Sequence, residues 1–360
     1  MYRILPLSLL LPAAVLAAGL TSSLQPGKAS LKSAGPLAFG PEGILFIGDP
    51  MAAQVVAIAT GDTKPGKSAR LDIPALHEKI AALLGVTPDQ ILVNDLAVNP
   101  ISKRAYLSVS RGRGPDAAAV LLKVESDGRV AEVNLDNVPH ATASLPNAPA
   151  ADAKDRRGQS LRTEAITDLA YVDGQVIVAG LSNEEFASNL RSIPFPFKGQ
   201  VSATSVEIYH GQHGRFETNS PVRTFTPYKI KNTPHILAAY TCTPLVRFPM
   251  SDLQPGKKVS GVTIAELGNR NRPLDMIIYK KGGADYILMN NSSRGVMKLP
   301  AANLDSYAPI TKQTEKAGVP YETLADWKGV EQLDRLDANN AVILVKAESG
   351  AMEIKTVALP

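Results

Sequence analysis

Short apolar runs separated by glycine turns and polar loops recur along nearly the whole chain. In the stretch 274–300, apolar runs alternate with a glycine turn and then a polar loop. The run at 275–279 has no helical period, and turn residues follow it at 281–283. Because similar units occur on both sides of this stretch, the pattern predicts a chain built of many short strands.

Six copies of this unit can be aligned. Their first apolar anchors lie 59, 73, 56, 51 and 57 residues apart, by subtraction of the residue numbers. The anchors are Leu37, Leu96, Leu169, Phe225, Met276 and Leu333. Repeats of roughly 40–50 residues or more, each with about four strands, are typical of propeller blades. The sequence therefore predicts an all-β fold, a six-bladed or alternatively seven-bladed β-propeller of four-stranded antiparallel blades.

The last repeat is too short for four strands. Only 28 residues, Leu333 to Pro360, remain for it, which is enough for about three strands of roughly 5–6 residues each. We expect the missing outer strand to come from the segment around Gln25 to Leu31. This pairing would join the two ends of the ring and remove a sheet edge.

Three segments between the strands are longer than a hairpin needs. Residues 72–85 begin with a capping Asp, have Pro in the first turn and end with Gly, which predicts a helix on the rim between the first two blades. Residues 139–159 are expected to form a mobile insertion between the second and third blades. Residues 183–204, rich in Pro and Phe, are expected to form an ordered lid.

The N-terminus has the composition of a secretory signal peptide. Arg3 is followed by an apolar run from Ile4 to Ala18 that ends in small residues and is short for a membrane span. We predict a signal peptide at 1–20, a single propeller domain at 21–360, and export to the periplasm or the extracellular space. No membrane span is expected after the signal is cleaved.

The charge balance argues against a nucleic-acid partner. Lys and Arg total 38 and Asp and Glu total 34, giving a net charge of +4, and the basic residues are dispersed along the chain. The single cysteine allows no internal disulfide. We expect a monomer whose partner is a small molecule or a protein.

Propeller topology assigns polar residues to one face of the ring. In a four-stranded blade, the loops between the second and third strands share a face with the connections between blades. The candidate ligand-binding residues on this face are Arg111, Asn183, Glu184, Cys242, Arg270, Arg272, Asn291 and Arg294. The acidic residues expected around the channel mouth are Asp95, Asp168, Asp275 and Glu331. A concave polar mouth is the default binding site, although an Asp at this position can simply hydrogen-bond the backbone of the next blade.

The repeats resemble the six-bladed propeller superfamily that includes the gluconolactonase/regucalcin-like proteins and the NHL-repeat proteins. The sequences Asp-Leu-Ala-Val at 95–98 and Asp-Leu-Ala-Tyr at 168–171 carry this resemblance, together with the apolar strands at 45–47 and 176–179. Lactonase-type relatives hold a divalent metal in the channel with Glu, Asn and Asp ligands. The resemblance implies a site for Ca²⁺ or another hard divalent cation, with the candidate ligands Asp95, Asp168, Asp275 and Asn290.

The histidines and the cysteine have the ligand types of a zinc or copper site. These residues are His210, His213, His235 and Cys242. The hairpin expected around His210 and His213 places them on the face opposite Cys242, so the ligands are not expected to meet. A lone Cys is usually a small buried apolar residue, and a thiol nucleophile or a soft metal ligand remains the alternative for Cys242.

Other catalytic motifs are missing from the sequence. It has no Cys-x-x-Cys-His haem motif and no Gly-x-Ser-x-Gly elbow, and its single Trp327 does not match the recurrent tryptophans of quinone-dependent propellers. Two functions remain the main candidates. One is a non-catalytic exported propeller that binds a ligand or protein at its polar face, and the other is a divalent-metal-dependent hydrolase of the lactonase or esterase type. An oxidoreductase or redox accessory protein is a third possibility.

Overall fold

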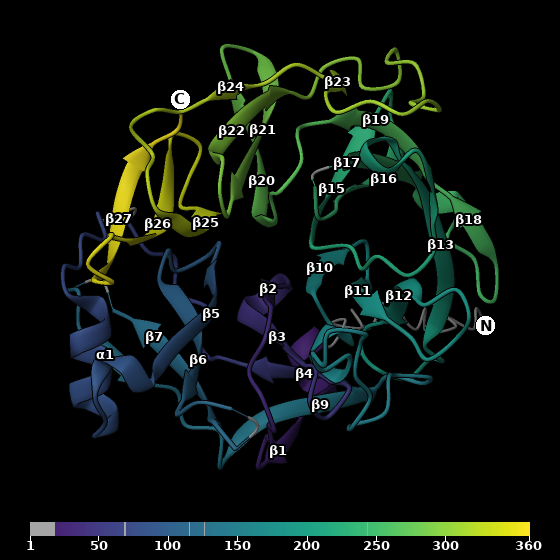
Figure 1. The fold of residues 1–360 in the computed structure, drawn as a ribbon. Coiled ribbons are helices and arrows are strands. Elements are labelled where there is room, and N and C mark those ends of the chain that lie inside the picture. The colour runs from purple at the N-terminus through teal and green to yellow at the C-terminus, as the bar shows by residue number, and fades with distance from the viewer. Residues whose placement is uncertain (1–18, 68–69, 115, 126, 243) are drawn as a thin grey trace, which may run out of the picture.

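The computed structural model describes residues 19–67, 70–114, 116–125, 127–242 and 244–360. The expected signal peptide lies almost entirely outside these residues. Six small, mainly antiparallel sheets are arranged in a ring (Figure 1), which confirms the all-β, six-bladed propeller. Among the described helices, none is long and apolar enough to cross a bilayer.

Each sheet is one blade, numbered by the chain order of its innermost strand. From the channel outward, blade 1 contains β2 (Leu37–Phe39), β3 (Ile44–Asp49), β4 (Gln54–Ala59), β9 (Val138–Ser144) and β1 (Gln25–Gly27). Blade 2 contains β5 (Ile91–Val98), β6 (Ala105–Arg111), β7 (Ala118–Val124) and β8 (Val130–Glu132). Blade 3 contains β10 (Asp168–Val172), β11 (Gln175–Leu181), β12 (Ser188–Pro194), β13 (Ser202–His210), β14 (Arg215–Glu217) and β18 (Lys258–Ser260).

The other three blades follow in chain order. Blade 4 contains β15 (Thr224–Ile230), β16 (Thr233–Ala239), β17 (Pro244–Pro249), β19 (Val262–Glu266) and β23 (Ala317–Gly318). Blade 5 contains β20 (Pro273–Lys281), β21 (Ala284–Asn291), β22 (Gly295–Pro300) and β24 (Glu322–Thr323). Blade 6 contains β25 (Val330–Arg335), β26 (Asn340–Lys346) and β27 (Met352–Ala358). The helices are η1 (Leu20–Ser23), η2 (Pro41–Gly43), α1 (Leu76–Leu84), η3 (Pro88–Gln90), η4 (Arg162–Glu164), η5 (Gly211–His213) and η6 (Met250–Asp252).

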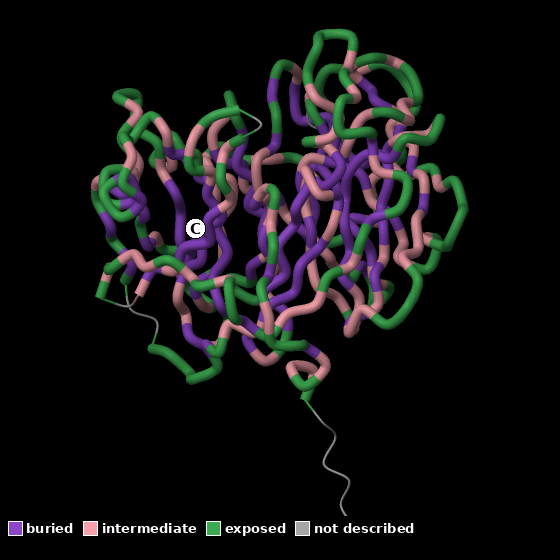
Figure 2. Tube along the Cα trace, turned by 90° about the horizontal axis from the view of Figure 1, so that it is seen from below, coloured by how far each residue is buried: buried purple, intermediate pink, exposed green. Residues whose placement is uncertain are grey.

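The hydrophobic core lies between the blades. Residues of the middle strands are buried on both sheet faces, for example Ile287, Leu288 and Met289 of β21, which explains why the sequence shows continuous apolar runs. Figure 2 shows these buried strands flanked by exposed loops at both ends. Between blades 1 and 3, Phe46 stacks on Tyr171 with ring centroids 5.6 Å apart. Blade-to-blade packing of this kind closes the ring.

The order of the blades around the ring differs from their order along the chain. The innermost strand of blade 2, β5, contacts β25 of blade 6 on one side and β2 of blade 1 on the other, and β2 in turn contacts β10 of blade 3. The order around the ring is therefore blade 2, 1, 3, 4, 5 and 6 (Figure 1). The six buried clusters agree with this order, since each lies between two blades that are neighbours in it.

The strand β9 makes this order possible and corrects two predictions. It follows blade 2 in the chain but returns to pair with β4, with Val55 opposite Ala143, so the start of the expected mobile insertion is a strand. The segment β1 pairs with β9 at the outer edge of blade 1. The prediction that this segment completes the last blade is therefore wrong. The outer edge of blade 6 is instead covered by Ile73, whose N–H donates to Ile354 O (2.8 Å).

The helix α1 also lies elsewhere than expected. It packs against β8 and β5 of blade 2 and β27 of blade 6, rather than between blades 1 and 2, because blades 2 and 6 are neighbours. Ala75, not Asp72, is its N-cap, and Gly85 ends it in the left-handed conformation (φ 67°), as expected for a C-terminal glycine. Asp72 instead accepts the N–H of Thr356 (3.1 Å).

The expected lid at 183–204 contains a regular strand, β12. This strand could not be predicted from the apolar pattern, because buried polar residues interrupt its apolar positions. Arg191 is almost fully buried, donates to Leu181 O (3.0 Å) and Ala165 O (3.3 Å), and has its pKa lowered to about 10 by burial. Because β12 takes the third position in blade 3, β13 is the fourth strand rather than the third. The direction of β13 is therefore opposite to the expected one.

Candidate functional site

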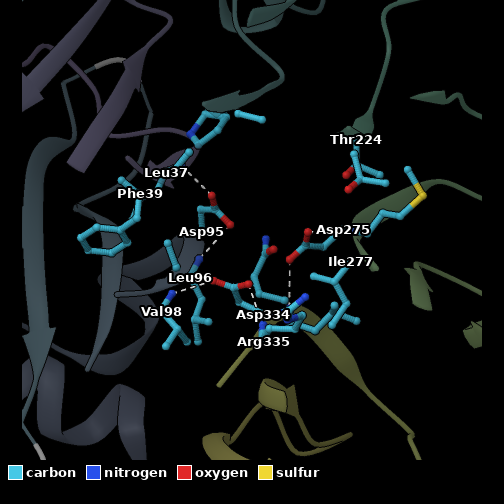
Figure 3. A pocket seen from close by; sticks show the side chains of 18 of the residues that line it. Leu37, Phe39, Asp95, Leu96, Val98, Thr224, Asp275, Ile277, Asp334 and Arg335 are labelled. Carbon is cyan, nitrogen blue, oxygen red and sulfur yellow. Dashed lines mark hydrogen bonds between the residues drawn. The ribbon is translucent and has the colours of Figure 1, made fainter. Parts of the chain in front are cut away.

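A channel runs through the centre of the ring and is lined by all six innermost strands. Its cavity has a volume of about 720 Å³. The innermost strands begin at one face of the ring, called the front face here. Figure 3 shows Asp95, Asp275 and Asp334 converging on this cavity from three different strands.

The channel aspartates link neighbouring blades through backbone hydrogen bonds. Asp95 accepts the N–H of Leu96 (2.8 Å) with one oxygen and the N–H of Leu37 in blade 1 (2.7 Å) with the other. The equivalent cross-blade bonds run from Phe225 N to Asp168 (2.7 Å), from Leu333 N to Asp275 (3.0 Å) and from Val98 N to Asp334 (2.7 Å). These contacts match the backbone-bonding role expected for Asp95, Asp168 and Asp275, although Asp95 lies inside β5 rather than at its start.

The fourth channel acid is Asp334 rather than Glu331. Glu331 lines a separate cavity that also contains His77 and Lys346. Asp334 follows the anchor Leu333 instead of preceding it, so the alignment missed it, although a search for acids on either side of each anchor would have included it. Asp334 accepts the N–H of Val98, which lies two residues after the anchor Leu96, whereas Asp95 accepts the N–H of the anchor Leu37 itself.

Burial dominates the electrostatics of the channel. It raises the pKa of Asp95 to about 8, that of Asp168 to about 7 and that of Asp334 to about 6, against the hydrogen bonds that favour the charged forms. It also raises the pKa of Asp275 well above its ordinary value, with repulsion from Asp95 adding to the effect. The channel therefore retains protons around neutral pH.

Three of the candidate calcium ligands, Asp95, Asp168 and Asp275, lie on innermost strands that are not direct neighbours in the ring, and Asn290 lies on β21, the second strand of blade 5. Both oxygens of Asp95, of Asp168 and of Asp275 already accept backbone N–H groups. Asn290 is buried and donates to Val330 O (3.2 Å) and Glu331 O (2.9 Å). A calcium or other divalent site at these four residues remains a prediction from the resemblance.

A second cavity, the mouth cavity, lies at the front face and has a volume of about 820 Å³. It is lined by the segments 32–36, 151–154 and 158–167 and by residues of the β6–β7 loop. Pro36, Asn94 and Thr167 line both this cavity and the channel, so the two spaces adjoin. The insertion after blade 2 thus builds a wall over the channel mouth.

Two buried or half-buried side chains fix the walls of the mouth cavity. Asp49 is fully buried and accepts the backbone N–H groups of Lys32 (2.7 Å) and Ser33 (3.0 Å), which holds the segment 32–36 against blade 1. Arg162 donates to Pro149 O (2.7 Å) and Met51 O (3.2 Å) and so holds the insertion. The cavity is therefore pre-formed, as small-molecule sites usually are.

The mouth cavity has an excess of positive charge. Lys32, Lys154 and Arg272 line it, and within the described residues their side chains make no ion pair or hydrogen bond. Of the two acids in the lining, Glu164 is neutralised by an ion pair with Arg223 from blade 4, which leaves Asp152. The lining favours a ligand with at least one negative charge.

Only one of the eight predicted ligand-binding residues, Arg272, lines the mouth cavity, and Arg111 directly follows the lining residue Ser110. Several of the others stabilise loops. Asn291 is buried and accepts from Asn271 (2.8 Å), Arg294 donates to Asn269 O (2.9 Å), and Glu184 accepts from Asn147 (2.9 Å). Asn183 and Arg270 are exposed loop residues. The structure therefore distributes the predicted set around the front face rather than gathering it in one site.

The structure corrects the expectation that the histidines and the cysteine lie on opposite faces. Because β13 is the fourth strand of its blade, it ends at the front face, where His210 and His213 meet Cys242. His235 does not join them. It lies at the other end of β16, where its Nδ1 is 2.8 Å from Thr233 O.

Comparisons with known proteins show similarity at the level of structure. No family model matches the sequence, and no curated protein matches it. Among the solved structures that match is a GH43 glycoside hydrolase, engineered to display both endo-xylanase and exo-arabinofuranosidase activity, with 14% identity and a TM-score of 0.39 over 75% of this chain. This chain covers about half of that one, 52% of its length. The six sheets and their connections place the protein in the class of six-bladed β-propellers.

Proposed function

We propose that this protein is an exported, non-catalytic β-propeller that binds a small anionic ligand in the mouth cavity. The observation that carries the proposal is the excess of positive charge around a pre-formed cavity of about 820 Å³, where Lys32, Lys154 and Arg272 face one remaining acid, Asp152. A cavity of this size lies within the range of about 300–1,000 Å³ that is common for small-molecule sites. Carboxylate and phosphate groups are the anions that Arg and Lys recognise most often.

The shape of the lining supports an amphipathic ligand. Pro36, Pro50, Met51 and Ile166 provide apolar surface beside the three cations. A ligand with an apolar body and an acidic group could place the body on this surface and the acidic group among the cations. The channel below would remain a structural element, because its aspartates are engaged in holding the blades together.

The proposal can be tested with 8-anilinonaphthalene-1-sulfonate, a fluorescent probe that combines an apolar body and a single negative charge. We expect the wild type to bind it at one site, and the double variant Lys154→Ser/Arg272→Ser to bind it about tenfold more weakly, since about 1.4 kcal/mol of lost charge interaction corresponds to a factor of ten. Lys312→Ser, on an exposed loop away from the cavity, serves as the matched control. Equal affinity of all three proteins for the probe would refute the proposal.

A further inference from the structure

His210, His213 and Cys242 form a compact group at the junction of blades 3 and 4. His210 ends β13, His213 ends η5, and Cys242 lies in the turn between β16 and β17. One ligand atom from each residue lies within 4.8 Å of the others. None of the three lines the channel or the mouth cavity, so this group is separate from the site proposed above.

A single carboxylate orients both imidazole rings. Glu217 lies 2.9 Å from Nδ1 of His210 through one oxygen and 2.6 Å from Nδ1 of His213 through the other. Ser220 donates its hydroxyl to the same carboxylate (2.6 Å), which fixes it in place. Since Nδ1 of each ring faces Glu217, Nε2 is the nitrogen of each ring that remains for a ligand. A carboxylate behind a histidine is the usual outer-shell arrangement of protein metal sites.

The group contains a buried nitrogen without a partner. His210 is only 2% exposed, and its Nε2 makes no hydrogen bond within the described residues. A buried polar atom without a partner is costly, and native proteins rarely keep one without a reason. A metal ion bound to Nε2 would satisfy it.

The loop that presents the histidines is held rigidly. The N–H of Gly211 donates to the buried carboxylate of Glu266 (2.6 Å), and the N–H of Thr314 donates to Gly211 O (3.0 Å). Cys242 has a positive φ of 64°, which is unfavourable for a residue with a side chain, and its N–H donates to Asn271 O (2.7 Å). Both sides of the group are therefore fixed before any ion binds.

We propose that His210, His213 and Cys242 bind one zinc ion through two imidazole nitrogens and one thiolate. Imidazole and thiolate together suit zinc and not calcium or magnesium. The thiolate supplies one negative charge to a divalent ion, and the Glu217 carboxylate, which also pairs with Arg215 Nε (3.5 Å), supplies part of a second. The side chain of His213 is 41% exposed, so solvent reaches the group and can supply water or an exchangeable fourth ligand. The ion would join blade 3 to blade 4 at the front face.

Cobalt(II) spectroscopy tests the site, because Co²⁺ replaces Zn²⁺ and reports the thiolate directly. We expect the wild type to bind one Co²⁺ per chain with a thiolate-to-cobalt charge-transfer band, and one equivalent of Zn²⁺ to abolish that band. Cys242→Ser should lose the band, and His213→Ala should weaken Co²⁺ binding at least tenfold. His140→Ala changes a histidine of β9 far from the group in sequence and should behave as the wild type.

Circular dichroism melting verifies that each variant is folded, and the two tested ligands are half-buried or exposed, so folding is expected to survive. Absence of Co²⁺ binding by the wild type, or a cobalt spectrum without a thiolate band, would overturn the proposal. Iodoacetamide labelling provides an independent result. Alkylation of Cys242 that Zn²⁺ does not slow, but that His213→Ala does, would identify a thiol nucleophile instead of a metal ligand.

Discussion

Replacing Asp168 by Asn should change how the stability of the propeller depends on pH. Asp168 accepts the N–H groups of Leu169 (2.7 Å) and Phe225 (2.7 Å), the second of which joins blade 3 to blade 4. The amide of Asn keeps the shape of the side chain and one acceptor oxygen, but it has no charge at any pH. The comparison therefore isolates the titration of one channel carboxylate.

The magnitude follows from the pKa of Asp168, which burial raises from 3.8 to about 7. A difference of about 3 pKa units corresponds to about 4 kcal/mol. The folded protein binds this proton more tightly than the unfolded chain does, so the contribution to stability is complete below about pH 4 and is lost as the pH rises through about 7. We expect the stability advantage of the wild type over Asp168→Asn to shrink by about 4 kcal/mol between pH 4 and pH 8.

Urea unfolding at pH 4, 6 and 8 measures this difference, with the fluorescence of the single Trp327 as the probe. Asp173→Asn is the matched control, because Asp173 lies in the exposed turn after β10. We expect the difference in free energy of unfolding between this variant and the wild type to be the same at all three pH values. If the free energy of unfolding of the wild type exceeds that of Asp168→Asn by a constant amount, or by an amount that grows as the pH rises, the channel does not hold this proton.

Three further predictions concern the metal group and the closure of the ring. Cys242→Gly should raise the free energy of unfolding in the presence of a chelator by about 1 kcal/mol, because glycine accepts the positive φ without strain; a decrease in urea midpoint would contradict this. Glu217→Gln should weaken zinc binding about 10–100-fold in competition titrations, whereas unchanged affinity would exclude its orienting role. Ile73→Pro should cost about 3 kcal/mol or more in urea unfolding, since it removes the N–H bonded to Ile354 and a buried side chain; a wild-type midpoint would show that this edge contributes little.

The blade repeat could be predicted from the sequence because the middle strands are buried on both faces. Strands such as β11 and β21 therefore appear as continuous apolar runs, and six repeats of the strand pattern indicate the fold. The last blade was also recognised as having only three strands of its own, which the structure confirms. The segment that covers its edge was not predictable, because Ile73 is far from Ile354 in the sequence and lies between two repeat units.

The position of the histidine group was missed for a different reason. The strand β12 contains buried Ser188, Asn189 and Arg191, so its sequence is typical of a loop. Omitting one strand from a blade reverses the direction of every later strand in it, and His210 was therefore assigned to the wrong face. Cys242 was assigned correctly to the front face because the sequence pattern predicts both strands that precede it in its blade.

The return of β9 to blade 1 has a consequence for the order in which the protein is assembled. Blades 1 and 2 are synthesised first, and β9 completes the pair within the first 144 residues, before any residue of blade 3 is made. Blade 6 then docks on residues made at the start, through contacts such as Asp334 with Val98, which are separated by 236 positions. Contacts this distant form slowly. We therefore expect the first two blades to leave the ribosome as a platform on which the other four are added, with the joint between blades 6 and 2 formed last.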